Sequence, residues 1–382
     1  MHQLWFPTSL LFGEGSLAVL AERLPALGKN ALLVTGGTAT ASMPAVTAIR
    51  DMLSESGGDC IHFAEVKADP DVETVERGAE LGASEGVELV IGLGGGSPLD
   101  AAKTIAARLT NPGPASAFFG TGNIAQPPLP LVCIPTTSGT GSEATQIAVL
   151  TDTANHRKMS VLSPLLYPAL SIVDPELAAS MSPALTAATG ADALTHAVES
   201  YVTVGAWEMT RGWSFRAVSF IASYLARAFQ DGSDREARHH LALASTLAGM
   251  AFSNSGLGLA HALAHPLGAL FGVAHGVANA VLLPAVMEFN LTEVPEAYRE
   301  IALLFGSNAA GLPPREAAGR AVQAVRDLFA ALQLPATISA CGVRKEHIPL
   351  LASEAMLNER LRASNPRTSN LEQITMIYRD CL

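Results

Sequence analysis

The chain has 382 residues, which is enough for two domains of ordinary size. Hydrophobic residues make up 49% of it and charged residues only 15%, and its 33 glycines and 23 prolines are spread along the chain, which excludes a disordered or collagenous protein. The formal net charge is -11 and no run rich in Lys and Arg is present. We therefore expect a small-molecule partner rather than a nucleic acid or a membrane surface.

Short aliphatic and β-branched runs alternate with amphipathic stretches over the first half of the chain. This alternation predicts an α/β domain in which helices cover a mostly parallel sheet. The predicted strands are Ala31–Thr35, Cys60–Ala64, Leu89–Leu93, Leu131–Ile134 and Leu170–Val173. The predicted helices between them are Ala41–Ser56, Val72–Glu85 and Asp100–Leu109.

After Asp174-Pro175 the pattern changes to long segments rich in alanine and leucine. These segments predict an all-α domain. The predicted helices are Pro183–Thr203, Glu208–Gln230, Arg235–Phe252, Gly256–Leu270 and Arg315–Leu332. We place the boundary so that residues 1–178 form the first domain and residues 179–382 the second.

A glycine-rich turn follows the predicted strand Leu89–Leu93 and leads into a helix. Its sequence is Gly94-Gly95-Gly96-Ser97-Pro98-Leu99-Asp100. Glycines let the backbone approach an anion closely, and the start of a helix offers N–H groups and a positive dipole to a phosphate. We expect Ser97 to cap the helix and Asp100 to complete a capping box. The spacing is not the usual GxGxxG, and a tight connection without a ligand is the alternative.

A second polar loop follows the predicted strand Leu131–Ile134. It runs from Pro135 through Thr136, Thr137 and Gly141 to Glu143. The ends of neighbouring strands in an open α/β sheet are where ligands bind. Two such loops at one edge of the sheet predict a dinucleotide site, and a solvent-exposed serine- and threonine-rich loop is the alternative.

Two pairs of polar side chains occur at helical spacing within apolar segments of the second half, and a fifth polar side chain follows the second pair. Asp192 and His196 are four positions apart, as are His261 and His265, and His275 follows. Residues four apart share a helix face, and buried polar groups need partners. Each histidine alone could be a hydrogen-bonded core residue. Together they offer one carboxylate and four imidazoles, and a set of one carboxylate and three imidazoles suits a divalent transition ion such as iron or zinc.

With these residues placed, the chain resembles the iron-dependent (group III) alcohol dehydrogenases over nearly its whole length. The matching motifs are Phe12-Gly13-Glu14-Gly15, Gly94 to Lys103, Pro135 to Glu143, Lys158-Met159, Val173-Asp174-Pro175, Gly190 to His196, His261 to Asn279, and Asn365-Pro366-Arg367. The resemblance implies a Rossmann-like first domain that binds a dinucleotide and a helical second domain for metal and substrate, in a dehydroquinate synthase-like architecture. It implies an oxidoreductase that interconverts a small primary alcohol and its aldehyde by metal-assisted hydride transfer.

The resemblance also implies roles for individual residues. The implied metal ligands, for Fe2+ with Zn2+ as the alternative, are Asp192, His196, His261 and His275. The implied cofactor-binding residues are Gly95, Gly96, Ser97, Asp100, Thr136, Thr137 and Lys158. His265 resembles the active-site histidine of the family that is not a ligand, and we expect it to relay a proton or to act as a structural hydrogen-bonding group.

Two departures from the family leave the cofactor open between NAD and NADP. Many members that prefer NAD carry an aspartate directly after the first nucleotide strand, whereas here Thr35 is followed by Gly36. The missing carboxylate removes a repulsion against the 2'-phosphate of NADP. Asp69 stands in Ala68-Asp69-Pro70-Asp71 where relatives often show Pro-Asn-Pro-Thr, and it could supply an acidic ribose contact instead.

By resemblance, the substrate pocket is expected to be lined by Ile147, Phe252 and Leu257, all apolar. Such walls favour short unsubstituted primary alcohols over 1,2-diols of equal length. One alternative is an acidic semialdehyde bound by Arg362. Another is a metal-dependent lyase resembling dehydroquinate synthase, although the ligand segments carry no Lys or Arg for a polyanionic substrate. A third is a non-catalytic sensor of nucleotide or metal.

The sequence also carries expectations about location and assembly. The segment Met1–Phe12 lacks the basic head and apolar run of a secretory signal, and the longest apolar stretch, Leu241–Phe252, is too short to span a membrane. The four cysteines form no CxxC pair. We expect a cytoplasmic homodimer or higher homo-oligomer.

Overall fold

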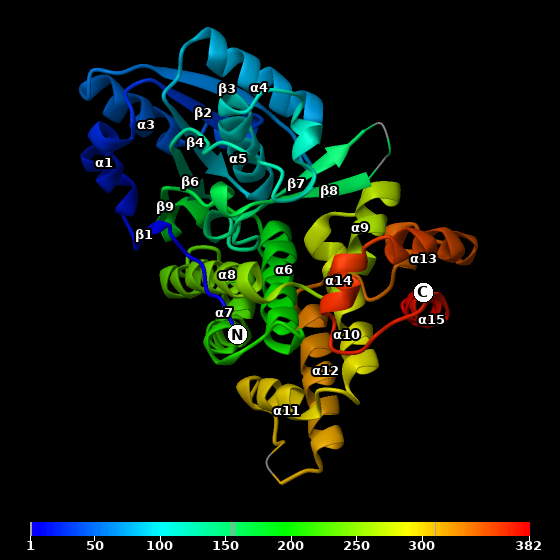
Figure 1. Ribbon diagram of the computed structural model, residues 1–382. Coiled ribbons are helices and arrows are strands. Elements are labelled where there is room, and N and C mark those ends of the chain that lie inside the picture. Colours follow the sequence, from blue (N-terminus) through cyan, green and yellow to red (C-terminus); the bar gives the residue numbers. More distant parts are fainter. Residues whose placement is uncertain (1, 154, 156, 310) are drawn as a thin grey trace. The chain divides into compact units, whose positions relative to one another are not determined.

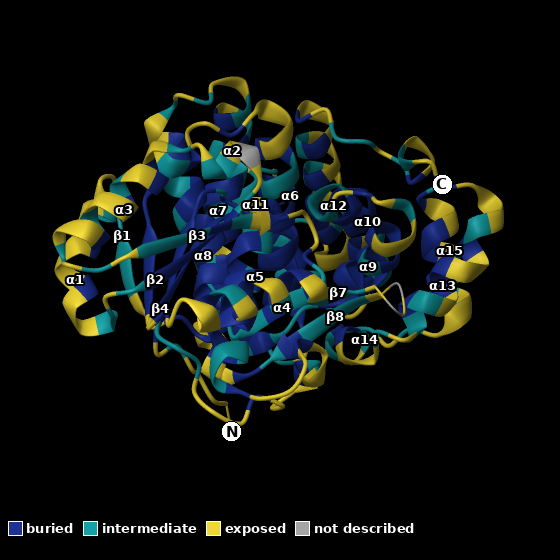
Figure 2. Cartoon of the chain, turned by 90° about the horizontal axis from the view of Figure 1, so that it is seen from above, coloured by how far each residue is buried: buried dark blue, intermediate teal, exposed yellow. Residues whose placement is uncertain are grey.

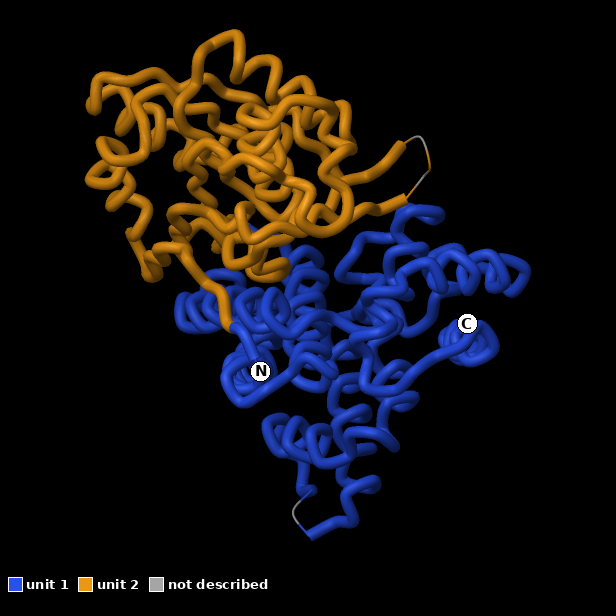
Figure 3. Tube along the Cα trace, in the orientation of Figure 1, with its two compact units in different colours: residues 1–3, 181–382 blue, residues 4–180 orange. Residues whose placement is uncertain are grey.

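The computed structural model describes residues 2–153, 155, 157–309 and 311–382. The chain divides into two compact units (Figure 3). The N-terminal unit is Leu4–Ser180, and the C-terminal unit is Met181–Leu382 together with the first residues of the chain. The boundary expected from the sequence, between residues 178 and 179, lies next to this division.

The N-terminal unit is built on a six-stranded sheet in which every neighbouring pair of strands is parallel. In spatial order the strands are β1 (Ser9–Phe12), β9 (Leu170–Val173), β6 (Leu131–Pro135), β4 (Leu89–Gly94), β2 (Ala31–Gly36) and β3 (Cys60–Val66). The inner strands β2 and β4 are almost entirely buried (Figure 2). Parallel sheets need cover on both faces, which explains why these strands read as continuous apolar runs.

Helices cover both faces of this sheet, as the alternation of strand side chains requires (Figure 1). On β2, Leu32 and Val34 join the apolar cluster of α4 (Val72–Ser84) and α5 (Gly96–Thr110). Ala31 and Leu33 join the opposite cluster, with α1 (Leu20–Leu27) and α3 (Pro44–Glu55). The predicted α/β class with a mostly parallel sheet is confirmed.

Some elements of this unit differ from the prediction. Helix α5 begins at Gly96 rather than at Asp100. Helix α3 begins at Pro44 rather than at Ala41, and a separate short helix, α2 (Thr38–Ala41), ends at the predicted first residue. The four-residue edge strand β1 was not predicted, nor was a small sheet of β5 (Gly120–Thr121), β8 (Arg157–Leu162) and β7 (Ile147–Asp152), in which β7 and β8 are antiparallel. These strands are short or only partly buried, so they lack the apolar runs that identified the others.

In the C-terminal unit, the described residues form helices and no strands, which confirms the predicted all-α half. Its helices are α6 (Pro183–Val202), α7 (Glu208–Gln230), α8 (Arg235–Ser255), α9 (Leu259–Phe271), α10 (His275–Asn290), α11 (Pro295–Leu304), α12 (Pro314–Ala331), α13 (Ile348–Met356), α14 (Glu359–Ser364) and α15 (Leu371–Asp380). Five of them, α6 to α9 and α12, match predicted segments. Across the described residues, none of the helices is long and apolar enough to cross a membrane.

Helix α6 is buried over most of its length. Small residues allow its neighbours to approach: a Cβ built on Gly190 would lie 2.2 Å from Leu225 Cδ1 of α7. Polar side chains in the middle of such a helix therefore face other helices and not water. The candidate site begins with these side chains of α6.

Candidate functional site

Three helices of the C-terminal unit carry the predicted metal ligands. Asp192 and His196 lie one turn apart on α6, and both are at least 95% buried. His261 lies in the first turn of α9, and His275 is the first residue of α10. The turn that joins α9 to α10 therefore brings the third and fourth side chains back to the same place.

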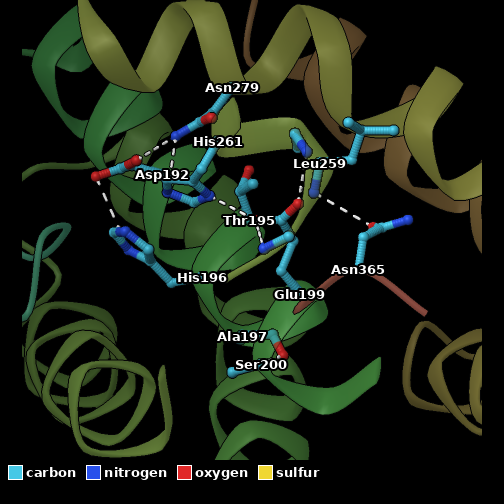
Figure 4. Close-up of polar contacts among 12 residues, drawn as sticks. Asp192, Thr195, His196, Ala197, Glu199, Ser200, Leu259, His261, Asn279 and Asn365 are labelled. Atoms are coloured by element: carbon cyan, nitrogen blue, oxygen red, sulfur yellow. Dashed lines mark hydrogen bonds and ion pairs between the residues drawn. The ribbon is translucent and has the colours of Figure 1, made fainter. Parts of the chain in front are cut away.

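The structure brings these four side chains together. One potential ligand atom from each of Asp192, His196, His261 and His275 lies within 4.8 Å of all the others. Figure 4 shows the first three turned toward one another. Three of the residues are buried, whereas the His275 side chain is 30% exposed. Three ligand candidates are thus shielded from solvent and the fourth is partly exposed, and a catalytic metal site needs a position that substrate can reach.

The protonation of His261 suits a ligand. Its Nδ1 donates to Glu199 Oε2 at 2.6 Å, so its Nε2 faces the cluster with a lone pair. Burial, together with the neighbouring His196, holds the pKa of His261 well below its usual value. A neutral imidazole with its second nitrogen bound to a carboxylate is the usual state of a metal-ligating histidine.

Asn279 on α10 shows where the ligand atoms converge. Its amide Nδ2 lies 2.8 Å from Asp192 Oδ1, 3.2 Å from His261 Nε2 and 3.3 Å from His275 Nε2. The Asn279 amide thus lies beside the proposed ligand atoms of three residues, and the Asn279 side chain is fully buried. One carboxylate and three imidazoles without a thiolate fit a divalent transition ion.

Glu199, also on α6, is a member of this site that the sequence analysis missed. Besides His261, it accepts hydrogen bonds from the backbone N–H groups of Gly258 and Ala260. Burial raises the pKa of Glu199 to about 7. Helical spacing carried a signal, because Glu199 follows Asp192 by seven positions and His196 by three and so shares their helix face.

The remaining predicted residues of the C-terminal unit lie near the ligands or pack on the helical core. Phe252 stacks on His196, with ring centroids 4.5 Å apart and planes 25° apart. The His265 ring lies 5.8 Å from that of His275, centroid to centroid. Leu257 is partly buried against the core. Arg362 donates to the carbonyl oxygens of Met356 and Ser369, so its guanidinium is engaged by local backbone.

In the N-terminal unit, the two polar loops follow the ends of neighbouring strands and lie side by side. Gly94 at the end of β4 pairs in register with Pro135 at the end of β6, and the Thr136 N–H donates to the Gly94 carbonyl. The loops then touch, because a Cβ on Gly96 would lie 2.6 Å from Thr140 Cγ2. Only glycine fits at this position.

The predicted capping of α5 is wrong. Its N-cap is Gly95, and no side chain caps the helix. Ser97 Oγ instead accepts from the Asp69 N–H, and the Asp100 carboxylate accepts from Ser142 Oγ and the Val149 N–H. Because the glycine turn itself enters the helix, the first N–H groups of α5 keep their capacity to bind an anion.

The other predicted cofactor residues surround the first turn of α5. Asp69 has a left-handed backbone, with φ of 54°, and its carboxylate pairs with Lys158 Nζ at 2.6 Å. Lys158 is only 5% exposed, against 49% for Asp69. Gly36 ends β2, and a Cβ there would meet Pro98 of α5 at 3.5 Å. Ile147, predicted for the substrate pocket, begins β7 in this same unit and is half-buried.

Known families match both halves of the chain. Residues 7–175 match the family described as "Iron-containing alcohol dehydrogenase". Residues 186–382 match the one described as "Fe-containing alcohol dehydrogenase family, C-terminal".

Similar proteins match over the full length. The NAD-dependent methanol dehydrogenase of Bacillus methanolicus is 35% identical, with all of both chains covered. The 1,3-propanediol dehydrogenase of Citrobacter freundii is 40% identical over 98% of this chain and 97% of that protein. Among solved structures, a 1,3-propanediol oxidoreductase superposes with a TM-score of 0.97 at 38% identity, over the whole of both chains.

Proposed function

The chain belongs to the iron-containing alcohol dehydrogenase family, and from this premise we propose that it interconverts a small primary alcohol and its aldehyde with a divalent ion held by α6, α9 and α10. It is an oxidoreductase that uses a nicotinamide cofactor. The observation that carries the proposed site is the convergence of four ligand atoms, from Asp192, His196, His261 and His275, within 4.8 Å. A bound ion supplies Lewis-acid stabilisation of negative charge on the substrate oxygen. We propose iron, with zinc as the alternative for the same ligands.

The surrounding side chains hold this site in shape. Asn279 donates to the Asp192 carboxylate, and Glu199 accepts the Nδ1 proton of His261. Phe252 covers the His196 ring and excludes water from that side. His265, next to the exposed ligand His275, is the residue we propose to relay the proton that leaves or enters with the alcohol oxygen.

The dinucleotide is proposed to lie across the two loops of the N-terminal unit. Its pyrophosphate would face the uncapped start of α5, beside Gly95, Gly96 and Ser97. Further contacts are proposed from Asp100, Thr136, Thr137 and Lys158. A surface groove lined by Gly37, Glu65, Lys67 and Arg77, among others, lies at the ends of β2 and β3, where the adenosine ribose binds in such folds.

This groove lets us predict an effect of Gly36→Asp on cofactor choice. The substitution should raise the KM for NADP by at least about tenfold more than that for NAD, because a carboxylate would face the 2'-phosphate. The backbone at Gly36 accepts a Cβ, since no atom lies closer than 3.5 Å to that position. Gly36→Asn is the control of equal size, and it should leave the ratio of the two KM values nearly unchanged. Equal effects of Gly36→Asp on both cofactors would place the adenosine elsewhere.

The substrate is proposed to be a short unsubstituted primary alcohol or its aldehyde. The predicted pocket residues Ile147, Phe252 and Leu257 are apolar, and one relative above is named for methanol, an unsubstituted primary alcohol. Another is named for 1,3-propanediol, in which both hydroxyls are primary. An acidic semialdehyde is the second candidate, but Arg362, its expected partner, is bound to backbone carbonyls. A lyase resembling dehydroquinate synthase is not favoured, because Gly190–His196 and His261–Asn279 contain no cationic side chain for a polyanion.

Catalytic efficiency on three aldehydes tests this proposal. Butanal should be reduced with a higher kcat/KM than lactaldehyde or a carboxylate-bearing semialdehyde, because a hydroxyl left unpaired on an apolar wall costs about 1–3 kcal/mol. The measurement follows the absorbance of the reduced nicotinamide. A clear preference for lactaldehyde would mean that the pocket offers a polar partner, and a preference for the semialdehyde would mean that a cation is available.

All four cysteines are free, which suits a reducing compartment, and we propose that the protein acts in the cytoplasm. The homodimer or higher homo-oligomer expected from the sequence stays a prediction.

A further inference from the structure

Glu199 is a buried carboxylate in the C-terminal unit that contacts both the start of α9 and a proposed metal ligand. Its side chain is almost fully buried on α6, on the same helix face as the ligands Asp192 and His196. A buried carboxylate needs several hydrogen bonds to offset its desolvation. Figure 4 shows that these bonds come from one place, the beginning of α9.

Two of the three bonds fix the start of α9. Glu199 Oε2 accepts from the Gly258 N–H at 2.9 Å, and Oε1 accepts from the Ala260 N–H at 2.6 Å. The N–H of Leu259 between them donates to Asn365 Oδ1 at 3.3 Å. A negative charge at a helix N-terminus is favourable, so the carboxylate suits the α9 end electrostatically as well.

The third bond reaches a ligand. His261 Nδ1 lies 2.6 Å from Glu199 Oε2. A carboxylate acceptor at this distance requires the ring proton on Nδ1, and it also fixes the rotation of the ring. The Nε2 atom is thereby left without a proton and is directed at Asp192 and Asn279.

We infer that Glu199 is a positioning residue for the metal site: it selects the Nδ1-protonated tautomer of His261 and aims Nε2 at the ion, while anchoring the helix that carries this ligand. The inference rests on the proposed ligand set. It makes α6 the source of two ligands and of the group that orients a third. The rival explanation is that Glu199 only caps α9.

Zinc affinity of paired variants separates the two explanations. Glu199→Gln keeps the size of the side chain but leaves one oxygen to serve three donors, so Zn2+ binding to the metal-free protein should weaken by about 10-fold to 100-fold. Asn365→Ala is the control, because it removes an acceptor from the same helix end without touching His261. It should lower the unfolding temperature yet keep the Zn2+ dissociation constant within about twofold of wild type. A chromophoric chelator in competition measures both constants.

Several outcomes would overturn the inference. If Zn2+ affinity is unchanged in Glu199→Gln, or falls equally in both variants, Glu199 acts only as a cap of α9. A wild-type protein that binds no Zn2+ would instead refute the ligand set of the proposed function. If Glu199→Gln does not fold, 15N spectra of the zinc-loaded wild-type protein with labelled histidine take its place. The inference requires a histidine ring whose Nδ1 is protonated and whose Nε2 binds the metal. The Nε2 signal of that ring must change when the metal is removed. The absence of such a ring from the spectra would contradict the inference.

Discussion

Removal of the bound ion by a chelator is expected to abolish turnover and to leave dinucleotide binding mostly intact. The reason is that the proposed metal ligands all lie in the C-terminal unit, whereas the proposed dinucleotide residues lie in the N-terminal unit. Metal content, turnover and dinucleotide affinity are measured on the same sample before and after chelation, and again after the ion is restored. Full activity in protein verified to be free of metal would contradict the proposed function.

Single substitutions at the site should divide into two groups. His261→Ala or His275→Ala removes a ligand and should be as damaging as chelation, with loss of bound metal. His265→Ala is the matched control, since it removes an imidazole one turn from His261 that belongs to no ligand set. It should retain the metal and lose only part of the rate. Loss of metal from His265→Ala would show that this residue holds the ion directly or through its neighbours.

Lys103→Met is expected to lower the free energy of unfolding by about 3–5 kcal/mol, the range for breaking a buried charge pair. Lys103 is completely buried in α5. Its ammonium donates to the carbonyl oxygens of Ser142, Thr145 and Ile147 and to Thr145 Oγ1, at 2.6 to 2.9 Å. Methionine would remove the charged donor from these acceptors, leaving the carbonyl oxygens of Ser142 and Ile147 with the longer hydrogen bonds from Thr145 Oγ1. It would also leave Asp100 without its nearby positive charge.

Urea unfolding of the variant and of a surface control measures this effect. Arg77→Met is the control, because Arg77 pairs with Glu65 and both side chains are more than half exposed. Such surface pairs contribute about 0–1 kcal/mol. A comparable small loss for Lys103→Met would mean that water reaches the cluster and replaces the ammonium.

Burial explains which elements were predictable from the sequence. The strands β2, β4, β6 and β9 are buried on both faces and therefore appear as uninterrupted apolar runs. The strands β7 and β8 are partly buried and mix polar with apolar residues, so their pattern was not recognised. The glycine turn was predictable, but α5 begins at Gly96, four residues before the predicted start, because the backbone at Gly95 and not a polar side chain begins the helix.

Local spacing predicted part of the proposed metal site, and the family resemblance separated the ligands His261 and His275 from His265. Asp192 and His196 share one helix face at four-residue spacing, inside an apolar segment where such groups need partners. The contacts of Glu199 in the C-terminal unit and of Lys103 in the N-terminal unit were not predictable in this way, although spacing places Glu199 on the helix face of Asp192 and His196. Glu199 meets His261 across 62 positions of sequence, and Lys103 meets its acceptors across about 40. Contacts of this kind arise from the packing of two separate elements, which a single sequence does not reveal.

The glycines around the proposed dinucleotide site have a consequence for protein engineering. Gly94 and Gly96 leave no space for a Cβ, because Pro98 and Thr140 lie within 3.0 Å of that position. Gly36 has only ordinary contacts, and Gly37 has no neighbour within 4 Å. Libraries that aim to change the cofactor should therefore randomise positions 36 and 37 and keep positions 94 and 96 fixed. A side chain at position 96 becomes feasible only together with a smaller residue at position 140, so these two sites must be varied as a pair.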